Sequence, residues 1–275
     1  MNRYTFSIPP LILLCCIILV VTGCSDSGTS AEQDDPPSLP SQLTPAMIDL
    51  SYFAGQNVPN DENHMVYKTV EAIAVAGGGL MQVGGLLNTA DAFLLFMKST
   101  NQRPEFSNGS WVWSVTVPFG FMKDAGYMQN VTQGEITVSI SAKPVTGGIE
   151  WEIRYTGLIG DDFLEDFGLI RGFTSDDEMS GEWNFYLPDG GNNPIMVYTW
   201  EKTSLTDFTM TMIAAYGGDT VTTVEYEKSG SENWMTFIEG SDITKVYWNE
   251  STHSGWIEQQ GQRVCYENFQ NAACS

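Results

Sequence analysis

Two clusters of carboxylates are the residues in this sequence with the most evident capacity for chemistry. They occupy residues 161–166 and 176–178. Carboxylates at this density suit hard cations such as Ca²⁺, although their spacing does not match an EF-hand loop. A solvated acidic loop is the alternative, and a hydrolase with a carboxylate site is also open, since a glycosidase needs a carboxylate pair. The weak calcium candidates are Asp161, Asp162, Asp176 and Asp177.

The histidines and the net charge argue against several classes of protein. His64 and His253 are the only histidines and lie far apart, which argues against a histidine-rich metal site and a Ser-His-Asp triad. No pairing of nucleophile and base is visible, so we expect no catalytic residue and no cofactor, and we lean away from an enzyme. The chain has 12 basic and 34 acidic residues, a net charge of −22. Because the basic residues form no cluster, we expect no nucleic-acid partner.

The N-terminus has the pattern of an export signal. Arg3 precedes an apolar core at residues 11–21, which is shorter than the roughly 20 residues needed to span a membrane. The core ends in Val21, Thr22, Gly23 and Cys24. This pattern resembles the lipobox of bacterial lipoproteins, in which an aliphatic residue, a small residue and Gly or Ala precede an obligatory Cys. Val21 replaces the commoner Leu.

The lipobox resemblance covers residues 1–24 and implies a lipid anchor. It implies that the Cys24 thiol carries a diacylglycerol, that residues 1–23 are a signal peptide removed by cleavage, and that a further acyl chain such as palmitate modifies the new amino group. Such acyl chains would bind the protein to a membrane of the bacterial cell envelope. Ser25 is compatible with the outer membrane, with the domain either periplasmic or surface-exposed. An ordinary secretory signal with a chance cysteine is the alternative.

Two further cysteines, Cys265 and Cys274, lie close together near the C-terminus. The envelope outside the inner membrane is oxidising, and a short loop of this kind closes easily. We therefore expect a disulfide between Cys265 and Cys274. Two free thiols are the alternative.

A disordered tether and a helical segment precede the rest of the chain. Residues 24–46 are rich in Ser, Asp and Pro, which predicts a disordered, lipidated tether. Residues 61–100 predict helix, with Asn60 or Asp61 as the cap. One straight helix accommodates the polar residues poorly, so we expect a break near residues 84–85 and a second helix after it.

Three consecutive glycines, Gly77, Gly78 and Gly79, interrupt the predicted helix. Each glycine costs about 1 kcal/mol relative to alanine in a helix interior. Something must offset this cost, and we expect the close approach of another backbone, such as one from a sheet.

From residue 111 onward the apolar period changes from that of a helix to that of a strand. Turn signals rich in Gly, Asn and Asp separate the segments, so we expect roughly ten to twelve short antiparallel strands. The predicted strands lie near residues 111–117, 136–140, 151–155, 183–187, 195–202, 208–213, 221–227, 234–239, 244–248 and 255–259.

These patterns predict a mainly β fold with an N-terminal helical segment, of the α+β class. We expect an antiparallel meander that forms a barrel or half-barrel, lipocalin-like in outline, with one or two packed helices. A single domain should cover residues 47–275, with helix at 61–100, the meander at 108–262 and a C-terminal tail at 263–275.

All eight tryptophans lie in the predicted β part. Where their side chains lie in the fold would distinguish between two hypotheses of function. The first is an envelope lipoprotein, not an enzyme, that binds or carries an apolar small molecule. The second is a carbohydrate-binding or adhesion module that uses exposed Trp. A solvent-open lumen lined by Trp and Met would favour the first hypothesis, and a flat outer face with two or three coplanar Trp would favour the second.

Overall fold

The computed structural model describes residues 35–39, 48–81, 94–95, 97–98, 102–118, 135–159, 162–204, 206–215 and 221–274. Contacts divide the chain into the units Met1–Asp35 and Pro36–Ser275. All described residues except Asp35 belong to the second unit. The signal peptide, Cys24 and the break expected near residues 84–85 lie outside the described residues. Leu39, which we expected in the tether, packs against the hydrophobic core.

The structure describes one long helix, α3, and a few short helical segments. α2 spans Ser51–Ala54, and the 3₁₀ turns η1 and η2 span Glu62–His64 and Pro188–Gly190. α3 spans Met65–Met81. Asp61 caps η1 by accepting a hydrogen bond of 2.9 Å from the backbone N–H of Asn63, which confirms it as the cap. No described helix is long and apolar enough to cross a membrane.

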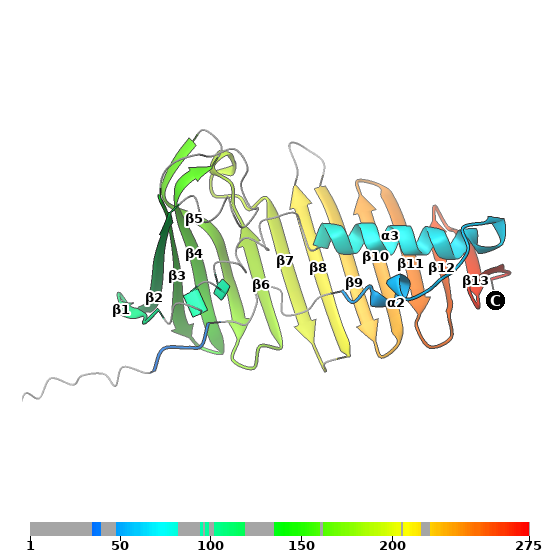
Figure 1. Cartoon of the computed structure of the whole chain (residues 1–275), viewed down its shortest axis with the longest axis horizontal. Helices are drawn as coiled ribbons and strands as arrows, with labels where there is room; N and C mark the ends of the chain where they lie inside the picture. The colour runs from blue at the N-terminus through cyan, green and yellow to red at the C-terminus, as the bar shows by residue number, and fades with distance from the viewer. Residues whose placement is uncertain are drawn as a thin grey trace, which may run out of the picture. The chain divides into compact units, whose positions relative to one another are not determined.

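The strands form one antiparallel sheet in which each strand pairs with its neighbours in the sequence. The sheet runs from β1 to β14 without closing, and α3 lies across the strands near the C-terminus (Figure 1). This confirms the mainly β meander, and the open sheet corresponds to the half-barrel alternative. The strands are β1 Glu105–Ser107, β2 Ser110–Pro118, β3 Glu135–Val145, β4 Gly148–Ile159, β5 Asp162–Ser175, β6 Ser180–Phe185, β7 Met196–Lys202, β8 Asp207–Ala215, β9 Val221–Ser229, β10 Glu232–Glu239, β11 Asp242–Asn249, β12 Ser254–Gln259, β13 Gln262–Glu267 and β14 Gln270–Ala272.

Three parts of the sheet differ from the sequence prediction: β1 precedes the meander expected at 108–262, and two further segments were expected as a loop and as a tail. The first acidic cluster, expected in a loop, lies largely within β5, whose pairing with β4 contains two register shifts. Residues 263–275, expected as a tail, include most of β13 and all of β14. Both segments lack a clean apolar alternation because charged side chains interrupt them, so periodicity alone does not reveal them.

One face of the sheet, called the inner face below, is apolar and buried. Its register aligns residues from successive strands in rows, because directly opposite residues of antiparallel strands share a face. Met235 lies on this face and contacts α3, so the helix covers its C-terminal end. One such row consists of Trp111, Ala142, Trp151, Gly172, Trp183, Tyr198, Met212 and Val224.

Strand glycines on the inner face make room for aromatic rings. Gly172 lies directly opposite Trp183, and Gly181 lies directly opposite Trp200. A Cβ atom at Gly172 would lie 2.1 Å from the Trp183 ring, and one at Gly181 would lie 2.2 Å from the Trp200 ring. The rings therefore occupy the space that a side chain would need, which explains glycine within these strands.

The helical glycines differ from one another in their surroundings. A Cβ atom at Gly77 would lie 2.3 Å from the Met235 sulfur on β10, and one at Gly78 would lie 2.5 Å from Leu50. A Cβ atom at Gly79 would meet nothing within 4 Å. The close approach expected at these glycines is therefore present at the first two. It involves side chains of the sheet and of residue 50, not another backbone.

Candidate functional site

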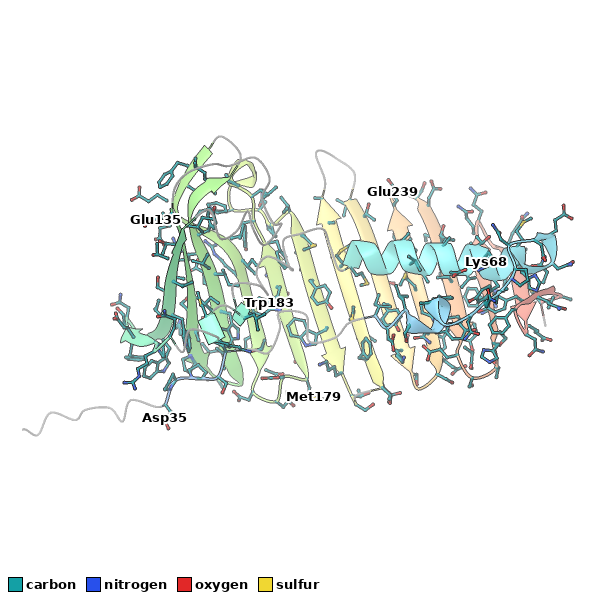
Figure 2. The ribbon with its side chains drawn as sticks, in the orientation of Figure 1. Asp35, Lys68, Glu135, Met179, Trp183 and Glu239 are labelled. Atoms are coloured by element: carbon teal, nitrogen blue, oxygen red, sulfur yellow. A yellow bond between two sulfur atoms is a disulfide. The ribbon has the colours of Figure 1, made fainter. Side chains whose placement is uncertain are left out.

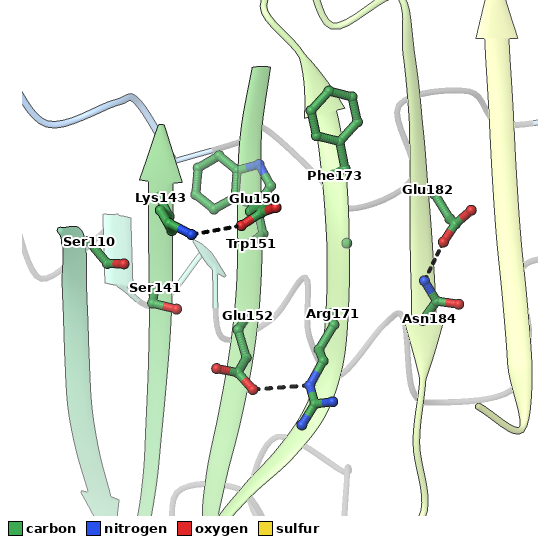
Figure 3. A pocket seen from close by; sticks show the side chains of 11 residues that line it. Ser110, Ser141, Lys143, Glu150, Trp151, Glu152, Arg171, Phe173, Glu182 and Asn184 are labelled. Carbon is green, nitrogen blue, oxygen red and sulfur yellow. Dashed lines mark hydrogen bonds and ion pairs between the residues drawn. The ribbon is translucent and has the colours of Figure 1, made fainter. Parts of the chain in front are cut away.

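The outer, polar face of the sheet, called the solvent face below, carries a hollow of about 500 Å³ over β2 to β6. Strand alternation places its side chains in two cross-strand rows over β3–β6 (Figure 3). The first row consists of Lys143, Glu150, Phe173 and Glu182. The second row consists of Ser141, Glu152, Arg171 and Asn184.

Ion pairs between neighbouring strands and a hydrogen bond within β6 orient the polar groups of the hollow. Lys143 Nζ lies 3.4 Å from Glu150 Oε2, and Arg171 Nε donates to Glu152 Oε1 at 3.1 Å (Figure 3). The side-chain amide of Asn184 donates to Glu182. These side chains are partly exposed, so each pair adds little to stability. Their effect is to hold donors and acceptors in fixed positions.

Arg154 extends this network beside the hollow. Its Nη1 donates to Glu152 Oε1 at 2.8 Å, and its Nε donates to Asp166 Oδ1 at 2.7 Å. The hydrogen bond to Asp166, together with the two carboxylate charges, raises the pKa of the Arg154 guanidinium. Glu152 is therefore held between two guanidiniums, those of Arg154 and Arg171.

Phe173 supplies an aromatic surface within this polar lining. Its ring covers the space beside Gly148, where a Cβ atom would lie 2.6 Å from the ring. Arg171 also lies 5.0 Å from the centre of the Tyr186 ring. Ligand sites combine aromatic surface with placed polar groups, and in this hollow the polar groups predominate.

The hollow is close to neutral in a strongly acidic protein. Two cations and three carboxylates line it, whereas the whole chain has a net charge of −22. No histidine or cysteine is among the residues that line it. The nearly neutral lining therefore suits binding of an uncharged polar molecule better than binding of a simple ion.

A second feature of the solvent face is a row of three rings on β10, β11 and β12. The aromatic row consists of Trp234, Tyr247 and Trp256, which lie opposite one another in register. The centre of the Tyr247 ring lies 5.3 Å from that of Trp234 and 5.8 Å from that of Trp256. All three side chains are half-buried. The ring planes differ by 40° and 24°, so the rings lean against one another and are not coplanar.

A buried polar cluster lies at the inner-face end of β9 to β11. Asn233 is fully buried, and its Oδ1 accepts a hydrogen bond of 2.6 Å from the Tyr226 hydroxyl. Its side-chain amide donates to Glu250, which also receives Lys228 Nζ at 3.3 Å. Burial raises the pKa of the Tyr226 hydroxyl. Since these groups satisfy one another, we interpret the cluster as structural.

The structure does not bring the calcium candidates together. Asp161 lies outside the described residues, and Asp162 begins β5, whereas Asp176 and Asp177 follow its other end. Asp177 accepts hydrogen bonds from the Ser175 hydroxyl at 2.7 Å and from a backbone N–H, and these lower its pKa. No group of three potential metal ligands occurs among the described residues.

The predicted cysteine pair is present and the histidines are separate. Cys265 and Cys274 form a disulfide with a Cα–Cα distance of 5.2 Å, which ties the chain after β14 to β13. His64 bonds to the carboxylate of Asp61 at 2.7 Å. His253 stacks on Phe269 with ring centres 4.6 Å apart. Neither histidine belongs to the hollow.

Sequence reasoning did not identify the hollow as a site. The alternation of Glu152 and Arg154 with apolar residues already indicated a polar face on β4. Arg171 lies on β5, which the sequence did not predict, and Glu182 lies on β6 just before the strand predicted at residues 183–187. Only the register of four strands shows that these charges meet. The chain has no match to a protein family, to a curated protein or to a solved structure, so the hollow has to be interpreted from its own geometry.

Proposed function

We propose that this protein is a lipid-anchored envelope protein whose folded part binds a glycan in the hollow over β3–β6. The observation that carries the proposal is the lining, which combines fixed donors and acceptors with the ring of Phe173. Sugars present many hydroxyl groups and an apolar ring face, so they need both kinds of partner. The near neutrality of the lining favours an uncharged glycan over an ionic ligand.

Two observations favour this hypothesis over a carrier with an apolar lumen. The Trp and Met side chains of the inner face are buried against the core, as Trp183 and Met212 illustrate with exposed fractions of 1% and 0%. The half-buried tryptophans Trp234 and Trp256 belong to the solvent face. The face that offers aromatic rings to a ligand is therefore the outer one.

The hollow can be tested with a pair of phenylalanines from the same strand. Phe173 lines the hollow, whereas Phe163 lies outside it on β5 and is 64% exposed. A glycan array probed with the full-length protein should identify a ligand, and Phe173→Ala should weaken its binding by about tenfold, or about 1.4 kcal/mol. Phe163→Ala should leave the affinity unchanged. An array without any retained glycan, or equal losses in both folded variants, would contradict the proposal.

The lipid anchor has an independent test. The wild-type protein should partition into detergent and incorporate a labelled fatty acid, and Cys24→Ala should lose both properties because the acceptor thiol is gone. Cys15→Ala and Cys16→Ala serve as controls, since both residues precede the expected cleavage point. Unchanged labelling of Cys24→Ala would exclude lipidation at this residue.

One observation supports an apolar ligand as a second candidate. A groove of about 420 Å³ lies between α3 and the β12–β13 hairpin. Met65 and Val264 line it and are 57% and 50% exposed. Native mass spectrometry of the full-length protein from its host distinguishes the two candidates. A retained glycan supports the hollow, and a retained lipid that Val264→Asp removes supports the groove.

A further inference from the structure

The aromatic row ends in different surroundings on its two sides. At one end, Arg263 on β13 lies over the Trp256 ring, with its guanidinium carbon 4.0 Å from the ring centre. Glu258 Oε2 accepts from Arg263 Nε at 3.0 Å and from Nη2 at 2.7 Å. This end therefore contains an indole, a carboxylate and a guanidinium between them, a combination in which the ring and the carboxylate both attract the cation.

The Trp234 end of the aromatic row contains an indole and a carboxylate but no guanidinium from the described part of the chain. Glu227 on β9 lies directly opposite Trp234, and opposite residues of antiparallel strands have Cβ atoms about 5 Å apart. The same row continues through Thr209 on β8 to Glu201 on β7. Neither glutamate forms an ion pair with any residue that the structure describes. An indole and a carboxylate are thus adjacent here without a cation of the chain.

The nearby lysines are directed elsewhere. Lys228 follows Glu227 and lies on the inner face, where it pairs with Glu250. Lys245 on β11 lies opposite both Thr236 of β10 and Glu258 of β12, so it is on the β11 side of Trp234 and not on the β9 side. The side of Trp234 that faces β9 is therefore bordered by carboxylate and threonine side chains.

We propose that Trp234 and Glu227 bind the guanidinium of an arginine on a basic segment of a partner protein. The contact would join the same three kinds of group that Arg263, Trp256 and Glu258 join within the chain, although Glu227 faces Trp234 from the neighbouring strand whereas Glu258 shares a strand with Trp256. A guanidinium suits the site because it is planar, stacks on an indole and remains charged. The net charge of −22 steers a basic partner towards the protein. This inference concerns β9–β10 and does not depend on the glycan proposal.

A labelled hexa-arginine peptide tests the site on the full-length protein. Trp234→Leu should raise the Kd by about fivefold, because the cation then loses its aromatic partner. Glu227→Gln should have a comparable effect through loss of the counter-ion. Glu239→Gln is the matched control, since it removes the same charge from the last residue of β10 (Figure 2), whereas Trp234 lies near the start of that strand. It should change the Kd by less than about twofold.

Two comparisons make the outcome decisive. Hexa-lysine should lose less affinity than hexa-arginine on Trp234→Leu, because an ammonium does not stack. Phe173→Ala should leave peptide binding unchanged, which separates this site from the hollow. Equal losses for Glu227→Gln and Glu239→Gln would overturn the proposal by showing that net charge alone attracts the peptide. Unchanged binding to a folded Trp234→Leu variant would overturn it as well.

Discussion

Tryptophan occupies both faces of the sheet, but with different neighbours. On the inner face, Trp183 and Trp200 lie over glycines of the adjacent strand and are almost fully buried. Their indole N–H groups find no hydrogen-bond partner among the described residues, so packing is their contribution. On the solvent face, Trp234 and Trp256 keep part of each side chain accessible; Trp256 stacks on Tyr247, and Trp234 is tilted against it.

The difference shows how one residue type can serve stability or recognition. A ring that lies over a glycine buries its own apolar surface and that of the neighbouring strand, and burial of apolar surface stabilises the fold. A ring that leans on another ring beside charged groups keeps an edge or face for a ligand. The following predictions test this division, beginning with the largest expected effect.

Alkaline pH should unfold the protein, because tyrosine hydroxyls that are buried in the core become ionised. Burial raises the pKa of Tyr52 and of Tyr155 to about 12 from the ordinary value of 10.0. The folded state therefore favours the neutral hydroxyl, and this stability is complete below pH 10.0 and lost as the pH rises through about 12. Circular dichroism and tyrosinate absorbance should change together in this window. Full titration at pH 10.0 with the fold intact would contradict the burial argument.

Truncation of a tryptophan should cost far more on the inner face than on the solvent face. Trp183→Ala should lower the free energy of unfolding by about 3–5 kcal/mol, because it leaves a cavity in the core. Trp256→Ala should cost about 1 kcal/mol, since its ring lies on the solvent face and is only partly buried. Urea unfolding of both variants measures the difference. Similar losses would show that the two faces contribute equally to stability.

The disulfide should contribute a moderate amount at the end of the sheet. The bridge closes a loop with a sequence separation of 9, for which the chain-entropy argument gives about 2–3 kcal/mol. The free energy of unfolding of the double variant Cys265→Ser with Cys274→Ser should fall by at most this amount. Part of the contribution of the bridge is local, because it orders the residues after β14. Peptide mapping without reduction should recover the linked pair. Rapid alkylation of both thiols in protein taken directly from cells would exclude the bridge.

Substitution by alanine at two glycines of α3, Gly77 and Gly79, should change the stability in opposite directions. Gly77→Ala should destabilise by about 1–3 kcal/mol, because its Cβ would collide with Met235 and Phe237. Gly79→Ala should stabilise by up to about 1 kcal/mol, since its Cβ meets nothing and alanine favours a helix. Thermal unfolding of the two variants gives the sign. A higher melting temperature for Gly77→Ala would show that α3 does not press on β10 there.

The class of fold and most strands were evident from the sequence because a half-buried strand leaves an alternating pattern. Residues 111–117 and 208–213 illustrate strands whose predicted position agrees with β2 and β8. β5 was missed because its acidic residues and its register shifts break the alternation. The cysteine pair was evident because a short separation, together with the oxidising compartment expected from the N-terminal pattern, is enough to predict a bridge.

Only the tertiary structure decided which charges and rings share a face and touch. Arg171 lies opposite Glu152, and Trp234 lies opposite Glu227, because of the register between strands. A shift by one residue would exchange the two faces of a strand, so register depends on the burial of every strand at once. The sequence by itself determined the alternation of each strand. The folded sheet determined the hollow and the aromatic row, because these arise from strands that meet only after folding.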